Sequence, residues 1–112
     1  MKAINPYLNF PGNTEEAFNF YKNAFGGEFA MLMRFKDSPE ASNTPAEDQN
    51  KLMHIALPIG KANVLMGTDS LESKGHQLRP GNNFHISISA ESDAETEKLF
   101  NALSAGGKVM VP

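Results

Sequence analysis

The sequence predicts an α+β fold made of two copies of one strand–helix–strand module, of which the second is incomplete. Residues 3–10 alternate apolar and polar side chains, as a strand does, and an amphipathic helical pattern and the pair Gly26-Gly27 follow. The same succession returns from the alternating run 83–89 to the pair Gly106-Gly107. A pattern that recurs in this way indicates an internal repeat.

The first module contains one helix and three further strands. Asn13 is a favourable N-cap residue, and Glu16, three positions later, can complete a capping box at the start of the helix. The segment 28–35 then has the alternation of a strand, and the runs 51–57 and 62–67 predict two strands joined by a short hairpin. These two added strands favour a βαβββ order over the βαββαβ order of a ferredoxin-like domain.

Two polar segments separate the strands. Residues 36–50 and 68–81 have no apolar period and are predicted to be exposed loops. Gly60 and Gly67 are interpreted as single turn glycines without a phosphate-binding role.

The second module has a predicted capping box at Ser92 and Glu95, but the chain ends at Pro112, inside the strand that would follow its helix. By comparison with the first module, roughly two strands are lacking. We favour truncation over a short natural variant. The chain is expected to form a single domain, with module 1 at about 1–68 and module 2 at about 82–112.

Composition narrows the class of function. The 112 residues carry a formal net charge of -3 with both signs interspersed and no basic patch, so we expect no nucleic-acid partner. The lack of cysteine excludes disulfides, thiolate metal sites and a cysteine nucleophile, and it fits a cytoplasmic location. No stretch approaches the roughly 20 apolar residues of a membrane helix, so no membrane association is expected.

The strands that open the two modules each have one polar face. Asn5, Tyr7 and Asn9 form this face in the first module, and His85, Ser87 and Ser89 form it in the second. If pseudo-symmetry brings the two strands together, these faces meet in one concavity, which is a common way to make a ligand pocket. Simple exposure of the face to water is the alternative.

The three histidines differ in their settings. His85 is central in its strand and could bind a metal or hydrogen-bond a ligand, although a lone strand histidine is more often structural. His54 is predicted to share a face with Leu52 and Ala56, where a core position is favoured over chemistry, and it is kept as a candidate ligand contact. His76 lies in a polar loop and is expected to be solvated.

Several runs of residues resemble one known family. They are Pro6-Tyr7-Leu8-Asn9-Phe10, Gly12-Asn13, Glu15-Glu16-Ala17, Phe20-Tyr21, Phe25-Gly26-Gly27-Glu28, Leu65-Met66-Gly67-Thr68-Asp69 and Asn82-Asn83-Phe84-His85-Ile86-Ser87. Across nearly its whole length the chain resembles the PhnB-like branch of the vicinal oxygen chelate superfamily, which also contains glyoxalase I, bleomycin-resistance proteins and extradiol dioxygenases. The resemblance implies two βαβββ modules whose mixed sheet forms a cup, helices on its convex side, and a homodimer.

The resemblance also bears on metal binding. Superfamily enzymes hold a divalent metal with four side chains from the first and last strands of each module. His85 matches one of these positions, whereas Asn5 replaces the first-module histidine and Leu65 or Met66 replaces the usual glutamate. The fourth position would lie beyond Pro112. The resemblance therefore implies one metal ligand among the three positions visible in this sequence.

Two functions are predicted. The favoured one is binding of a small molecule in the cup without metal chemistry. Its candidate contacts are Asn5, Tyr7, Asn9, Met33, His54, Met66, His85 and Ser87. The alternative is a glyoxalase-like lyase or isomerase in which His85 and a carboxylate from further strands hold Zn²⁺, Ni²⁺ or Mn²⁺. Members of this branch often carry the name demethylubiquinone methyltransferase, but no glycine-rich S-adenosylmethionine loop follows a strand here.

Overall fold

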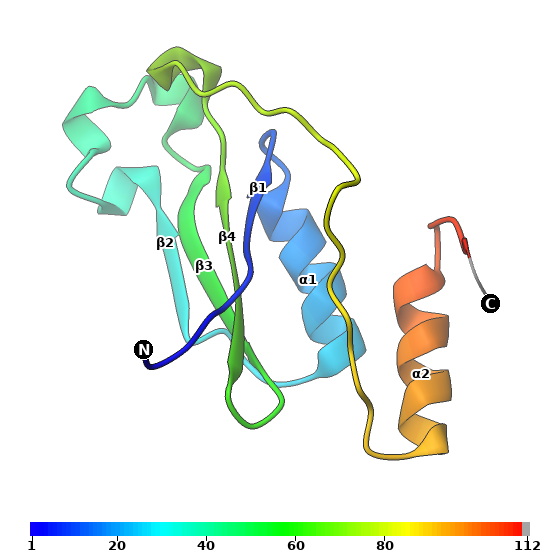
Figure 1. The fold of residues 1–112 in the computed structure, drawn as a ribbon. Coiled ribbons are helices and arrows are strands. Elements are labelled where there is room, and N and C mark those ends of the chain that lie inside the picture. Colours follow the sequence, from blue (N-terminus) through cyan, green and yellow to red (C-terminus); the bar gives the residue numbers. More distant parts are fainter. Residues whose placement is uncertain (111–112) are drawn as a thin grey trace.

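The structure is a computed structural model that describes residues 1–110 of the chain. Its strands and helices follow in the order β1 (Tyr7–Phe10), α1 (Thr14–Phe25), β2 (Met31–Arg34), β3 (Leu52–Ile59), β4 (Asn63–Asp69) and α2 (Asp93–Ser104). One sheet lies against α1, and α2 stands beside α1 on the side away from the sheet (Figure 1).

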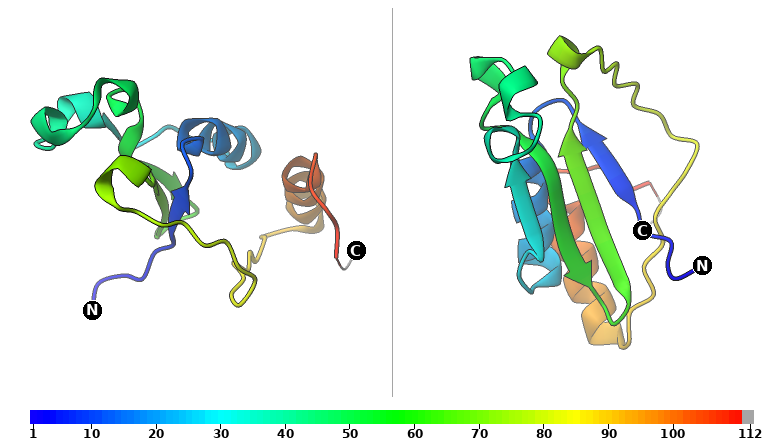
Figure 2. Two further views of the ribbon diagram at one scale, coloured as in Figure 1. Left: turned by 90° about the horizontal axis from the view of Figure 1, so that it is seen from above. Right: turned by 90° about the vertical axis from the view of Figure 1, so that its left-hand side faces the viewer.

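The four strands form one mixed sheet in the order β1-β4-β3-β2. β1 runs parallel to β4, whereas β4, β3 and β2 are antiparallel neighbours. A parallel pair needs a crossover connection, which α1, β2 and β3 supply between β1 and β4. The α+β class and the βαβββ order of the first module are therefore confirmed. The sheet is an open layer that does not curl into a cup (Figure 2).

α1 packs on one face of this sheet through Phe18, whose side chain is fully buried. The core cluster consists of Phe18, Leu52, Ile55, Leu57 and Leu65. A Cβ atom at Gly67 would lie 2.6 Å from Cε1 of Phe18, so a glycine is required where α1 approaches β4. Gly67 is a strand residue that permits close packing, and its interpretation as a turn glycine is wrong.

The start of α1 is capped from the sheet. Asn13 makes no side-chain capping bond, contrary to the expectation. Instead, Thr14 donates from its backbone N–H (3.0 Å) and from its hydroxyl (2.6 Å) to Oδ1 of Asp69, at the end of β4. The N–H of Leu52 donates to the other oxygen of the same carboxylate at 2.8 Å. Asp69 thereby joins α1, β3 and β4, and its negative charge suits the positive end of the helix dipole.

A β-bulge changes which residues of β3 share a face. Met33 pairs with His54, but the next residue of β2, Arg34, pairs with Leu52, which leaves Met53 without a partner. The bulge turns Leu52 toward α1, where its side chain is buried, while His54 stays on the opposite face. The expectation that His54 shares a face with Leu52 is therefore wrong, and so is the core position favoured for it.

The segment 83–89 is not part of the sheet. It is extended but has no strand partner among residues 1–110, and it runs beyond the β1 edge (Figure 2). Its alternate side chains Phe84, Ile86 and Ile88 are 67%, 48% and 47% exposed. We call these three residues the apolar strip. The strand expected after the second helix is also not formed at residues 108–110, and Val111 lies outside the described residues.

α2 begins with the predicted cap in modified form. The hydroxyl oxygen of Ser92 accepts from the N–H of Glu95 at 3.1 Å, while the Glu95 carboxylate accepts from the N–H of Glu91 at 2.9 Å. α2 contacts α1 but buries none of its residues fully. Within residues 1–110, neither helix has the length and apolar character needed to cross a membrane.

Candidate functional site

Five of the eight candidate residues gather on the face of the sheet that is turned away from α1. The register places Tyr7 beside Met66 and Met33 beside His54, and directly opposed residues of a sheet point to the same side. We call this surface the open face. It consists of Tyr7, Asn9, Met31, Met33, His54, Ala56, Met66 and Thr68. None of these side chains carries a fixed charge.

The rings of Tyr7 and His54 meet across the open face. The phenol oxygen of Tyr7 lies 3.4 Å from Nδ1 of His54, and the ring centroids are 5.7 Å apart. Because β4 separates β1 from β3 in the sheet, the two rings bridge the strand that carries Met66. Tyr7 is 47% exposed and His54 is half-buried. The pair can therefore offer a hydrogen bond to a ligand that rests on the face.

Three thioethers surround the centre of the open face. Met31 and Met66 pair with Ala56 from either side, and Met33 lies one row further along, beside His54. Methionine side chains are flexible and polarisable, and a sulfur–aromatic contact contributes about 0.3–1.5 kcal/mol. Ala56 itself is buried, at 7% exposure, so the long side chains of Met31 and Met66 on either side of it present the apolar surface of this row.

The other three candidates lie elsewhere. Oδ1 of Asn5 accepts from the backbone N–H of Val64 at 3.0 Å, so Asn5 extends the β1–β4 pairing. His85 and Ser87 are exposed on the segment 83–89. The concavity expected from two polar faces meeting is thus not formed among residues 1–110.

Two open cavities lie at the end of the open face. The smaller has a volume of about 360 Å³ and is lined by Asn9, Thr68, Ser70, His76, Gln77 and Leu78. The larger, of about 1070 Å³, borders it through Ser70, His76, Gln77 and Leu78 and extends between the loops. The larger cavity contains none of the eight candidates. The smaller one matters more for the site, because it shares Asn9 and Thr68 with the open face.

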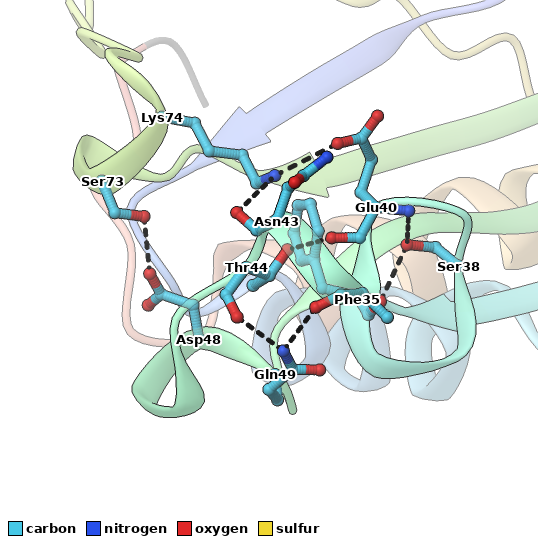
Figure 3. Close-up of polar contacts among 10 residues, drawn as sticks. Phe35, Ser38, Glu40, Asn43, Thr44, Asp48, Gln49, Ser73 and Lys74 are labelled. Carbon is cyan, nitrogen blue, oxygen red and sulfur yellow. Dashed lines mark hydrogen bonds and ion pairs between the residues drawn. The ribbon is translucent and has the colours of Figure 1, made fainter.

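The segment 35–50 is a folded lobe, where the sequence predicts an exposed loop. It forms three short 3₁₀ turns and is tied to the turn Glu72–Lys74. Nζ of Lys74 lies 3.4 Å from Oε2 of Glu40, and the hydroxyl of Ser73 donates to Asp48 at 2.8 Å (Figure 3). These cross-links hold the walls of the larger cavity together.

Lys51, which lines the larger cavity, forms an ion pair with a neighbouring carboxylate. Nζ of Lys51 lies 2.8 Å from Oδ1 of Asp48. The hydrogen bond from Lys51, followed by that from Ser73, holds the pKa of the Asp48 carboxyl below its usual value, and Asp48 raises the pKa of Lys51. Glu47 and Glu72 also line this cavity. Its electrostatics therefore disfavour an anionic ligand.

The residues present do not fit a divalent-metal site of the kind that the resemblance implies. Within residues 1–110, no group of three or more His, Cys, Asp or Glu side chains is placed to hold an ion. Asn5 is bonded to the backbone, Leu65 is buried beneath α1, and Met66 offers a soft thioether where a hard carboxylate is expected. His85 is on a separate segment.

His76 is among the residues around the site that the sequence analysis does not identify as candidates. Its Nδ1 accepts from the backbone N–H of Leu71 at 3.0 Å. Gly75, with φ of 79°, reverses the chain so that the imidazole folds back onto this turn. The ring is exposed, as expected, but it is anchored. The one signal in the sequence was a glycine directly before a histidine in a polar loop.

The chain is similar to proteins of one known family. The family model described as 3-demethylubiquinone-9 3-methyltransferase matches residues 2–111. The chain belongs to this family. It is 26% identical over 114 residues to Protein YjdN of Escherichia coli (strain K12), covering 95% of this chain and 75% of YjdN.

Two solved structures are similar to this family member. Protein PA1353 from Pseudomonas aeruginosa has a TM-score of 0.82 and 38% identity, over 97% of this chain and 77% of PA1353. The PhnB protein from Bacillus cereus has a TM-score of 0.62 and 23% identity, over 97% of this chain and 78% of that chain. The second likeness supports the fold alone.

Proposed function

We propose that this member of the 3-demethylubiquinone-9 3-methyltransferase family binds a small molecule on the open face of its sheet. The observation that carries the proposal is the contact between Tyr7 and His54 across β4, which lies among three thioethers and next to a 360 Å³ cavity. Small-molecule sites commonly combine apolar and aromatic contact area with a few hydrogen-bonding groups that fix orientation.

The two faces of the sheet have different roles. One is covered by α1 and builds the core around Phe18. The other leaves apolar area in water, including Met31, which is 46% exposed. Removing such area from water contributes about 25 cal/mol per Å², so a ligand that covers the thioethers gains affinity there. Tyr7, Asn9 and His54 then supply the polar contacts.

We also propose that the chain belongs to the vicinal oxygen chelate superfamily but binds its ligand without a metal. The βαβββ module supports the first part, and the replacement of metal-ligand positions by Asn5 and by Leu65 or Met66 supports the second. The family's name refers to a methyltransferase, and we do not extend methyl transfer to this chain. Elemental analysis tests the metal claim, since about one Zn, Ni or Mn per chain after gentle purification would contradict it.

We also propose that the chain forms a homodimer and that it is located in the cytoplasm. The exposed apolar strip supports the dimer, because apolar side chains on an unpaired extended segment favour association with another chain. The lack of cysteine supports the reducing compartment.

NMR titration of the ¹⁵N-labelled protein with phenol tests the binding site. Phenol is uncharged, flat and able to hydrogen-bond, so it matches the features of the open face. We expect saturable shifts of the backbone amides of Tyr7, His54 and Met66. Shifts confined to the apolar strip and α2 would show that the face does not bind this class of molecule.

A further inference from the structure

The smaller cavity continues the open face at one end of the sheet. It begins where β1 and β4 end, since Asn9 and Thr68 are paired neighbours on those strands and both line it. Tyr7 and Asn9 are two residues apart on one face of a strand, a separation of about 6.8 Å. A molecule that rests on Tyr7 can therefore reach the cavity.

The imidazole of His76 is oriented by hydrogen bonding to the backbone of one buried residue, Leu71. The N–H of Leu71, whose residue is 1% exposed, donates to Nδ1 of His76, and the carbonyl oxygen of Leu71 accepts from the backbone N–H of His76 at 3.1 Å. A ring nitrogen that accepts a hydrogen bond carries no proton. The neutral ring therefore holds its proton on Nε2, where it is a donor.

The remaining cavity groups are uncharged. Asn9 and Gln77 contribute amides, Thr68 and Ser70 contribute hydroxyls, and Leu78 contributes apolar surface. A carboxylate placed among them would lose hydration without gaining a partner of opposite charge. A carbonyl group can accept from Nε2 of His76 and keep the remaining contacts neutral.

We propose that the smaller cavity binds the uncharged carbonyl or amide end of the ligand, with Nε2–H of His76 as the orienting donor. The inference rests on the proposed function, because the body of the same ligand lies over Tyr7 and His54. It names a ligand class: a flat, neutral molecule with a hydrogen-bond acceptor at one end. It also assigns His76, Ser70 and Gln77 to the site.

Benzamide and benzoate form a matched pair of probes, because they share a flat ring and differ in the charge of the end group. Titration of the ¹⁵N-labelled chain should show that benzamide shifts the amides of Leu71, His76 and Gln77 and binds about tenfold or more tightly than benzoate. Equal binding of the two probes would overturn the inference.

The variant His76→Asn removes the proposed ligand donor but keeps the hydrogen bond that anchors the turn. The asparagine oxygen can replace Nδ1 as the acceptor for the N–H of Leu71, but the side chain lacks a donor at the position of Nε2. We expect the variant to keep the Leu71 amide resonance near its wild-type position and to bind benzamide about tenfold more weakly. Asn101→Ala, on the exposed surface of α2, is the control and should bind as the wild type does.

The outcomes distinguish the two proposals. If benzamide shifts the amides of Tyr7 and His54 but binds His76→Asn as tightly as the wild type, the proposed role of His76 is wrong. The open-face site would still be supported. The absence of saturable shifts anywhere on the open face or in the smaller cavity, with either probe, would overturn both.

Discussion

Gly67 of β4 lies directly beneath the ring of Phe18 of α1. A Cβ atom at Gly67 would be 2.6 Å from Cε1 and 2.9 Å from Cζ of that ring, which is closer than packed carbon atoms approach. This contact sets how near α1 comes to the sheet. It commits one face of β4 to the core, so the other face, with Met66 and Thr68, remains available to a ligand.

Gly67→Ala should destabilise the fold. The added methyl group must displace Phe18 or α1, and overpacking of this kind costs about 1–3 kcal/mol. Urea unfolding followed by circular dichroism measures the change. Gly81→Ala is the matched control, because a Cβ at Gly81 meets no atom within 4 Å. Equal stability of the two variants would show that the contact between α1 and β4 is not tight.

Asp69→Asn should also lower stability. The Asp69 carboxylate accepts three hydrogen bonds, two from Thr14 and one from Leu52, and an amide would turn its NH₂ group toward one of these donors. Leaving a buried donor unpaired costs about 1–3 kcal/mol. The exposed Asp37 provides the control, since Asp37→Asn should leave the urea midpoint within experimental error. A midpoint for Asp69→Asn that matches the wild type would contradict the capping role.

The ion pair between Glu15 and Arg34 should contribute a small, pH-dependent stabilisation. The guanidinium donates to both oxygens of Glu15, at 3.0 and 2.8 Å, and this hydrogen bonding lowers the pKa of the Glu15 carboxyl. A lowered folded-state pKa gives stability that is present above the unfolded value of about 4.3 and is lost as the pH falls through the folded value.

Glu15→Gln should therefore be less stable than the wild type at neutral pH by about 0.5 kcal/mol, a figure discounted for the partial exposure of both side chains. The difference should vanish toward pH 3, in a series of urea titrations from pH 3 to about 7. Glu16→Gln controls for the helix dipole, because Glu16 is in the same first turn and is exposed. A difference that grows as the pH falls would have the wrong sign.

Association through the apolar strip should depend on its hydrophobic character. Ile86→Thr combined with Ile88→Thr keeps β-branched side chains but replaces apolar surface with hydroxyls, so we expect a larger monomer fraction in sedimentation velocity. Ser87→Thr, on the opposite side of the same segment, should sediment as the wild type does. An unchanged dimer in the double variant would place the interface elsewhere.

Much of the architecture is visible in local patterns. The period of the strands and of α1 predicts the α+β class and the βαβββ order, and Ser92 with Glu95 predicts the start of α2. These features depend on residues close together in the chain, where alternation and capping chemistry act directly. Alternation likewise assigns Tyr7 and Asn9 to one polar face, whereas Met33 and Met66 are candidates because methionine offers adaptable apolar contact.

The remaining features depend on contacts between distant residues. The bulge at Met53 follows from pairing with β2, and no local pattern shows that it separates His54 from Leu52. Asp69 caps a helix whose first residue, Thr14, is 55 positions away in the sequence. His76 is anchored by a turn inside a segment without periodicity. Residues 83–89 do alternate apolar and polar side chains. Alternation alone does not make a strand, because the hydrogen-bond ladder also requires a neighbouring strand.

The affinity of phenol for the wild type, His54→Ala and Phe84→Ser tests the open-face site most directly. His54 lies on the open face and Phe84 on the apolar strip, so the two variants separate the proposed site from a non-specific apolar surface. We predict that His54→Ala weakens phenol binding, measured by NMR titration, by about fivefold or more, while Phe84→Ser leaves it unchanged. Weakened binding in Phe84→Ser with wild-type affinity in His54→Ala would contradict the account.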